Sequence, residues 1–443
     1  MTVLHKEQVG ELLTSIDNQI EERTSNTREY SFIIDHAMSD PATMIYYADD
    51  TGCNAMSTEW FGLLGIRPCV LKDGAVLYYL NPNNFNKTID GANADLTTLG
   101  NDVMIEIPKM GVKGVWISKE KLKVTITTAR NARDFDYSAF SKNAYNDSEY
   151  LYVGVYKCYC TGNKMYSSKG RTPTASQTLA TYRQWANNRG EGYFDVSYAV
   201  DELLTCLYCL IVRNLNSQAA IGPGHTNANN TGPINTGGSE AYGMLNELAT
   251  ATQKGDSGYH VKCLGIEDMW GNIWQWEDGI IKSASAEHST SGEHCTILRA
   301  ATHSAMNSDG TNYKQVANIL FGYSYEFGGH YHENGYITRM NGTTGAIFIP
   351  CRGGGTNTTY YTDEHNVDEE LMTVFTVGGR WVDDLAAGIT FRYALHVPNG
   401  VWSVVASYMC EHHLLTLDGY HNVGYKIPTD QSIHMYPYLY KFS

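Results

Sequence analysis

The chain has 443 residues, of which 32 are Tyr, 42 are Gly and 18% are charged. Disordered chains are poor in aromatic residues, so this composition excludes that class and indicates a globular protein of roughly two or three domains. The formal net charge of −15 argues against a nucleic acid or an anionic membrane as partner, because phosphate groups are bound by clustered cations.

The first residues predict an amphipathic helix, since apolar residues recur at helical spacing between Leu4 and Ile20 and the pattern ends near Arg23. A single short helix is marginal in water. We therefore expect residues 1–40 to be an assembly or attachment segment that packs on its own domain, on another copy or on a larger assembly. Charges interrupt this stretch, so no signal peptide is visible and synthesis in the cytoplasm is expected. The most apolar run, Leu203–Val212, is too short to span a bilayer, and no membrane insertion is expected.

Strand patterns begin beyond Trp60. They are short runs of β-branched and aromatic residues that stop at turn-forming residues, and they lie at Ala75–Leu80, Val103–Ile107, Val112–Ile117, Val124–Ile126 and Tyr150–Tyr159. We expect residues 41–97 to form a β-rich connecting region.

Two helices follow these strands. Helical spacing and capping residues predict one over Thr178–Asn187 and a second, apolar enough to be central to the core, over Ser197–Leu215. A loop rich in Gly, Asn, Thr and Pro covers Ile221–Gly238, and short strands continue to the carboxyl end. Helices early and many short strands late indicate an α+β fold.

The sequence offers few candidates for catalysis or metal binding. A zinc site could use both Cys158/Cys160 and Cys206/Cys209, but the spacing matches no zinc finger, and buried free thiols are the favoured interpretation. His330–Glu333 lacks a third ligand, and the adjacent Asp383 and Asp384 do not readily face one ion. Neither G-x-S-x-G nor a Walker motif is present. We therefore expect no catalytic residues, no metal and no cofactor.

The sharpest motif is Gly265–Trp276, which places three Trp residues around Gly271-Asn272. This pair permits a tight turn with positive φ. Indoles that hold the core together are favoured over a direct binding role, so Trp270, Gly271, Asn272 and Trp274 are assigned to the scaffold.

This motif resembles the G-N-V-W-E-W element of the formylglycine-generating-enzyme type of C-type lectin-like fold. Val377–Trp381 resembles the G-G-[SRN]-W segment that follows it. Further stretches resemble phage tail proteins with this fold, namely Asn81–Asn84, Asp102–Lys109, Ser168–Pro173, Gly345–Pro350 and Thr358–Asp363. The resemblance covers about Trp60 to His413. It implies a C-type lectin-like domain over residues 98–443, preceded by the short helix and the small β-rich region.

Enzymes of this fold use paired cysteines near the carboxyl end for copper and oxygen chemistry. Cys351 and Cys410 are the only cysteines after Cys295, and no second one lies a few residues from Cys410. An oxidoreductase of this type with altered chemistry stays open as an alternative. A fixed-specificity lectin also stays open, although His396–Asn399 lacks the acidic or amide residue that calcium lectins have before Pro.

The chain is more similar to variable proteins of diversity-generating retroelements, of the phage tropism-determinant type. Their segment from G-G-x-W to a closing strand corresponds here to residues 378–410, and Cys410–His412 resembles their C-D-H end. Such systems mutate adenines in AAY codons, which never become Trp, Lys, Met, Gln or Glu. Apart from Trp402, none of these five types occurs from Val382 to Tyr408.

The resemblance implies a non-enzymatic receptor-binding adhesin on the virion tail, with a host cell-surface protein or glycan as its receptor. It also implies a homotrimer and contacts with other phage tail proteins. The expected ligand-binding residues are Val382, Asp383, Asp384, Ile389, Phe391, Tyr393, His396, Val397, Val401, Ser403 and Val404. The expected frame around them comprises Gly378, Gly379, Trp381, Gly388, Ala394, Gly400 and Trp402.

Overall fold

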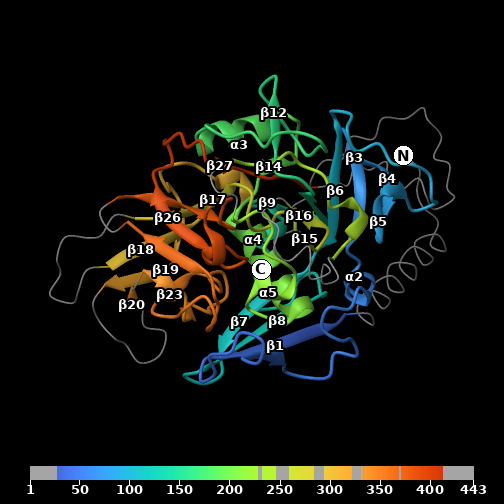
Figure 1. Ribbon diagram of the computed structural model, residues 1–443. Helices are drawn as coiled ribbons and strands as arrows, with labels where there is room; N and C mark the ends of the chain where they lie inside the picture. Colours follow the sequence, from blue (N-terminus) through green and yellow to red (C-terminus); the bar gives the residue numbers. More distant parts are fainter. Residues whose placement is uncertain are drawn as a thin grey trace, which may run out of the picture. The chain divides into compact units, whose positions relative to one another are not determined.

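A computed structural model describes residues 27–227, 232–245, 259–283, 294–321, 331–332, 334–368 and 371–412, all within one compact unit. The helix expected between Leu4 and Arg23 lies outside these residues. The fold is mixed and rich in sheet with few helices, which agrees with the broad α+β expectation (Figure 1).

One sheet has the strand order β2-β1-β8-β7. Its members are β1 (Glu29–Asp35), β2 (Ile45–Tyr47), β7 (Gly111–Trp116) and β8 (Lys121–Thr127). A second sheet has the order β14-β28-β11-β6-β3-β4-β5. It comprises β3 (Arg67–Lys72), β4 (Ala75–Asn81), β5 (Asn84–Thr88), β6 (Asn101–Pro108), β11 (Tyr150–Gly154), β14 (Tyr193–Asp195) and β28 (Met409–His412). Strand β3 lies before residue 97, where the β-rich connecting region was expected to end, and β6 lies after it. The two strands pair, so this sheet contains residues from both sides of that boundary.

The third sheet carries the carboxyl-terminal motifs. Its order is β20-β19-β18-β17-β25-β26-β24-β21, and β27 pairs with β17. Its strands are β17 (Trp274–Lys282), β18 (His294–Arg299), β19 (Lys314–Phe321), β20 (Tyr331–His332), β21 (Gly335–Tyr336), β24 (Glu364–Val367), β25 (Thr373–Val377), β26 (Arg392–His396) and β27 (Val405–Ala406).

Short hairpins and turns complete the strands. The two-stranded pairs are β9 (Ser141–Asn143) with β10 (Asn146–Asp147), β12 (Tyr159–Thr161) with β13 (Lys164–Tyr166), β15 (Lys262–Cys263) with β16 (Ile266–Glu267), and β22 (Arg339–Met340) with β23 (Pro350–Arg352). Single 3₁₀ turns lie at Ser138–Phe140, Glu240–Tyr242, His303–Ala305 and Asp384–Ala386.

The α-helices are α2 (Glu59–Leu64), α3 (Leu179–Asn187), α4 (Tyr198–Val212) and α5 (Ser217–Ala220). Both helices expected from the sequence are present, and each begins after a side-chain cap. Thr178 accepts a hydrogen bond from the Thr181 N–H, and Ser197 accepts one from the Val200 N–H. The second helix ends at Val212, earlier than expected, because Arg213 adopts a left-handed conformation with φ 54°.

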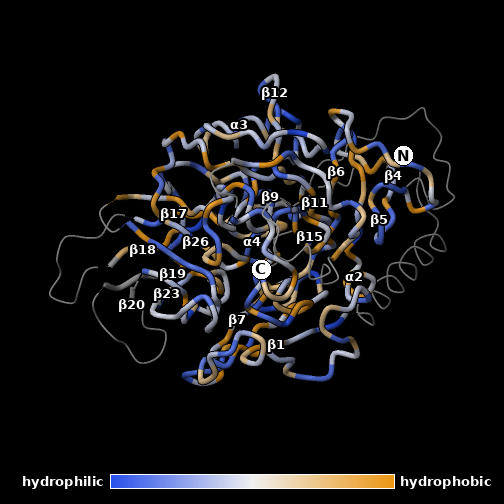
Figure 2. The backbone as a smooth tube through the Cα atoms, in the orientation of Figure 1, coloured by the Kyte–Doolittle hydropathy of each residue, from blue (hydrophilic) through white to orange (hydrophobic). Residues whose placement is uncertain are grey.

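Helix α4 is the centre of the core. Every residue in it except Ala199 is buried, and it contacts β17 as well as β1 and β8. Figure 1 shows it in the middle of the fold. A helix that is apolar on all sides is stable only when other elements surround it. Figure 2 shows hydrophobic and hydrophilic stretches alternating along the chain around it.

The strands expected at Ala75–Leu80, Val103–Ile107, Val112–Ile117 and Val124–Ile126 correspond to β4, β6, β7 and β8. The run Tyr150–Tyr159 instead divides into β11 and the start of β12, because the peptide groups between them bond to other segments. Among the described residues, no helix is long and apolar enough to cross a membrane.

Candidate ligand-binding site

The two glycine motifs found in the sequence contact each other. Gly271 and Asn272 form a tight turn with φ 76° and 63°. The Gly271 N–H donates to the Gly378 carbonyl at 3.0 Å, and the Trp381 N–H donates to the Asn272 carbonyl at 3.1 Å. A Cβ atom on Gly378 would lie 2.6 Å from the Met269 carbonyl oxygen, so this approach requires glycine. The start of the carboxyl-terminal segment is therefore fixed on the Trp motif.

The three indoles of the motif are buried. Trp270 donates from Nε1 to the Gly222 carbonyl at 3.0 Å, and Trp276 is fully enclosed. Trp274 donates from Nε1 to Asp383 Oδ2 at 2.6 Å, which ties this indole directly to the carboxyl-terminal segment. The motif therefore acts as a support for that segment.

Strand β26 decides which side chains of the segment face inward. It pairs with β25 and β24, and its burial alternates with the period of two that a strand requires. Arg392, Ala394 and His396 point into the core, whereas Tyr393 is half-buried.

Three of the expected ligand-binding residues are placed in the interior. Ile389 and Phe391 pack in the core, and His396 is only 6% exposed because it shares the inner face of β26 with Arg392. The His396 ring lies 5.4 Å from Trp274 and 5.9 Å from Trp276 between centroids. This corrects the sequence analysis, which expected all three at the binding surface: they are buried and belong to the scaffold.

The other expected ligand-binding residues reach the surface together with Trp402, and we call them the exposed set. Val401 is 59% exposed and Trp402 37% exposed. The other members are exposed or half-buried, and they are Val382, Asp383, Asp384, Tyr393, Val397, Ser403 and Val404. Trp402 was expected to be part of the frame, yet it contributes to this surface while its ring packs 4.5 Å from His396.

Asp383 and Asp384 have different roles although they are adjacent. Asp383 accepts hydrogen bonds from the backbone N–H of Arg380 and from Trp274, so it holds the turn after Gly379. Burial raises the pKa of Asp383, while Trp274 and Arg380 oppose that shift. Asp384 is exposed.

A depression of about 320 Å³ adjoins the exposed set. It is lined by Tyr336, Asn357, Glu364, Asp383, Asp384, Leu385, Ala386 and Tyr393. Tyr393 donates from its hydroxyl to Glu364 Oε2 at 2.9 Å. The sequence analysis missed Tyr336 and Glu364, because only the pairing of β21 with β24 and of β24 with β26 brings them beside the segment.

The segment also depends on a glycine inside the fold. A Cβ atom on Gly388 would lie 2.0 Å from Asp363 Oδ1. Asp363 is buried and accepts hydrogen bonds from the N–H and the hydroxyl of Thr390, each at 2.8 Å. This supports the expectation that Gly388 belongs to the frame.

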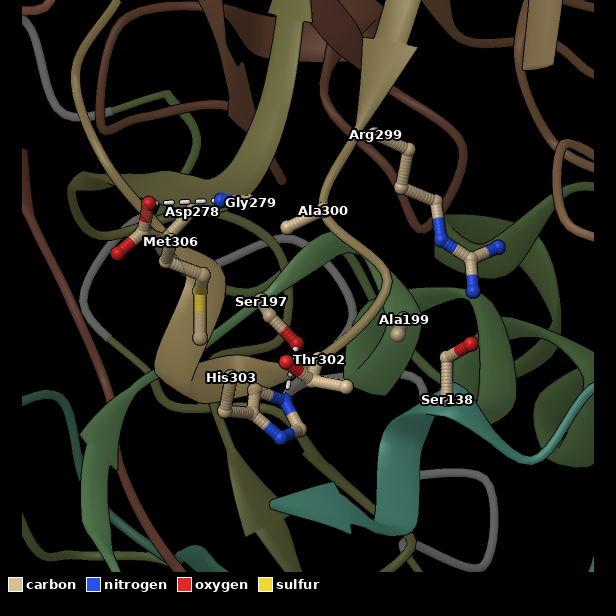
Figure 3. Close-up of a pocket in the computed structure, with 10 residues that line it drawn as sticks. All are labelled: Ser138, Ser197, Ala199, Asp278, Gly279, Arg299, Ala300, Thr302, His303 and Met306. Atoms are coloured by element: carbon tan, nitrogen blue, oxygen red, sulfur yellow. Dashed lines mark hydrogen bonds between the residues drawn. The ribbon is translucent and has the colours of Figure 1, made fainter. Parts of the chain in front are cut away.

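Ser197 and His303 have a geometry that resembles a catalytic pair (Figure 3). Their Oγ and Nε2 atoms are 2.9 Å apart, and His303 Nδ1 lies 3.1 Å from the Ser141 carbonyl oxygen. The Ser141 carbonyl can only accept, so Nδ1 carries the proton of the neutral ring, and Nε2 accepts from the Ser197 hydroxyl. The adjoining cavity, however, has only about 10 Å³, which is room for one water molecule. The pair fixes the cap of α4.

The cysteines give no sign of a redox centre. All ten are free thiols, and Cys206 and Cys209 are buried on α4. Cys158 and Cys160 have their sulfur atoms 3.8 Å apart, but within the described part of the chain no cluster joins them to other metal-ligand groups. Burial raises the pKa of Cys410, the thiol that an oxidase-like reaction would need ionised. His330 and Glu333 lie outside the described residues.

A buried ion pair joins His260 to two acidic residues of the Trp motif. His260 Nδ1 lies 2.7 Å from Asp268 Oδ2 and 3.4 Å from Glu267 Oε1. Burial lowers the pKa of His260, but Asp268 and Glu267 outweigh this and raise it to about 9. The carboxylates also accept hydrogen bonds from the Gly237 N–H and the Asn272 amide. A protonated His260 donates at Nδ1, so the group is arranged as an ion pair.

This ion pair predicts a pH-dependent stability. The pKa of His260 is higher in the folded state than its ordinary 6.5, so its contribution is complete below pH 6.5 and is lost as the pH rises towards 9. We expect His260→Gln to be destabilised at about pH 6, and the difference from wild type to shrink by about 2 kcal/mol by about pH 9.5. Urea unfolding followed by Trp fluorescence measures this. A difference that stays constant with pH would contradict the role of the charge.

Compared with models of protein families and with curated proteins, the chain gives no match.

Proposed function

We propose that the protein is a non-enzymatic receptor-binding adhesin of a phage tail. In this proposal a C-type lectin-like scaffold presents a diversified surface to a host cell-surface molecule. The observation that carries it is that residues 378–404 contain two groups, one that anchors the segment and one that lies at the surface. The frame of this segment is bonded to the Trp motif, whereas the exposed set faces solvent. A rigid frame with outward side chains tolerates substitution at the surface without loss of the fold.

The sequence of the segment supports diversification. Lys, Met, Gln and Glu are absent from Val382 to Tyr408, as expected of positions encoded by AAY codons that have mutated. Trp402 cannot arise from such a codon, so it is a fixed member of the exposed set. The closing strand that the resemblance implies corresponds to β28, which lies between β11 and β14 in its sheet.

Aromatic packing gives the exposed set a stiff base. Trp402 packs on His396, and His396 packs on Trp274, so a chain of rings leads from the core to the surface. On the other side of Trp274, the Tyr393 ring lies 4.2 Å from Phe391 between centroids. Rigid aromatic side chains that lose little entropy on binding are the common anchors of protein interfaces. We therefore assign the main contacts to Trp402 and Tyr393, with Val401 beside Trp402. A homotrimer, held in the tail by contacts with other tail proteins, would present several copies of this surface and so add avidity.

The gene itself offers the most direct test. We expect sibling isolates to differ at codons for members of the exposed set other than Trp402. We also expect a near-copy of the codons for Trp381–Tyr408 to lie near a reverse-transcriptase gene. Codons for Arg392 and Gly388 are expected to stay constant, because both residues are buried. Changes spread evenly along the gene would refute diversification.

Binding to cells tests the surface. The purified, fluorescently labelled chain is incubated with a panel of bacterial strains, and bound label is measured by flow cytometry. We expect Trp402→Ala and Tyr393→Ala to weaken binding to a positive strain by about tenfold or more. Leu77→Ala is the matched control, because Leu77 is an apolar side chain that is 50% exposed on β4. Retained binding in both variants, or equal loss in the control, would contradict the assignment.

A further inference from the structure

A second depression, of about 310 Å³, lies away from the 378–404 segment in sequence and is lined by none of its residues. Its lining comprises His36, Glu120, Thr338, Arg339, Arg352, Gly353, Gly354 and Tyr360. Two arginines in one depression are notable in a chain whose net charge is −15.

The two arginines are held side by side by the backbone. Arg339 on β22 is directly opposite Arg352 on β23 in an antiparallel pair. Side chains at opposite positions project from the same face, and like charges there repel each other. Such a pair is stabilised when an anion binds between the two guanidinium groups.

Existing partners account for only one of the two charges. Arg339 stacks on Trp116 at 4.0 Å, donates to the Lys119 carbonyl at 2.5 Å and lies 3.6 Å from Glu120 Oε2. Arg352 is exposed, and within the described part of the chain its guanidinium has no hydrogen bond or ion pair. Arg339 is therefore already positioned, and Arg352 is available to a ligand.

Further donors lie along the same depression. The N–H groups of Gly353 and Gly354 and the hydroxyl of Tyr360 have no hydrogen-bond partner among the described residues. Gly353 and Gly354 line the depression, and a backbone N–H there without a protein acceptor takes water or a ligand as its partner. Burial lowers the pKa of His36 to about 4, so its ring adds no charge near neutral pH.

We propose that this depression is a binding site for an oxyanion, a phosphate or carboxylate group, held between Arg352 and Arg339 with the Gly353 and Gly354 amides as additional donors. Oxyanions match the planar fork of arginine and the free amide donors, whereas a neutral sugar would leave the charge of Arg352 uncompensated. This site is separate from the exposed set and does not depend on the adhesin proposal.

Isothermal titration calorimetry of the full chain at low ionic strength tests the site with inorganic phosphate, glucuronate and glucose as probes. We expect phosphate, glucuronate or both to bind, and Arg352→Gln to weaken that binding by about tenfold or more, because it removes a charge-assisted donor. Glucose is expected not to bind. The two anions distinguish a phosphate ligand from an acidic sugar.

Two variants keep the test specific. Arg133→Gln removes the same charge from a side chain that is 95% exposed and outside the depression, and it should leave anion binding unchanged. Trp402→Ala should also leave it unchanged, so failure of this site is distinguishable from failure of the adhesin proposal. Absence of binding by both anions, or equal weakening in Arg352→Gln and Arg133→Gln, would overturn the site.

Discussion

Replacing Arg392 with Met is expected to reduce the free energy of unfolding by about 3–5 kcal/mol. Arg392 is the first residue of β26, and its buried guanidinium group makes ion pairs with Asp201 on α4 and Glu277 on β17. It also donates to the Phe348 carbonyl at 2.9 Å. Removing the arginine leaves two carboxylates inside the core without a cation, and this is the costly outcome for a buried charge cluster.

The two carboxylates of this cluster make the stability loss of the variant depend on pH. Burial already raises the pKa of Glu277 to about 8, against the opposing effect of Arg392. Without the arginine, Asp201 and Glu277 will bind protons more readily in the folded state, so the variant should lose more stability at about pH 7 than at about pH 5. Urea unfolding at both values measures the difference.

Two further variants serve as comparison and control for the stability loss of Arg392→Met. Arg392→Lys keeps the charge but loses the planar fork that reaches both carboxylates, and an intermediate loss is expected. Arg133→Met serves as the control, because Arg133 is exposed. If Arg392→Met remained within about 1 kcal/mol of wild type, the buried cluster would not be a main support of the segment.

Replacing Trp270 with Ala is expected to cost about 3–5 kcal/mol of stability. The indole is fully buried, donates to the Gly222 carbonyl and packs edge-on against Tyr208 of α4 at 6.2 Å between ring centroids. The substitution leaves a cavity beside the turn that holds Gly378, and it removes the indole donor of the Gly222 carbonyl. Thermal unfolding followed by circular dichroism measures the loss.

Trp402 provides the matched comparison. Trp402→Ala removes the same side chain from a site that is 37% exposed, and a loss below about 1 kcal/mol is expected there. Trp270→Phe, which keeps most of the buried area, should lie between the two. Equal losses for Trp270→Ala and Trp402→Ala would contradict the distinction between a supporting and a surface tryptophan.

Local features of the fold follow from the amino-acid sequence alone. The helices α3 and α4 follow from apolar spacing and from the capping side chains of Thr178 and Ser197, which act within a few residues. The turn at Gly271-Asn272 follows from residues that tolerate positive φ. Because these interactions are short-range, the residues that form them are adjacent in the chain and can be read from it.

The exposure of side chains in the carboxyl-terminal segment, in contrast, depends on long-range packing. A period of two gives β26 two faces, but its pairing with β24 and β25 determines that His396 and Arg392 face the core while Tyr393 does not. The same pairing brings Glu364 to the depression, and the β22–β23 register sets Arg339 opposite Arg352. These arrangements depend on contacts between residues far apart in the chain, and no local pattern encodes them.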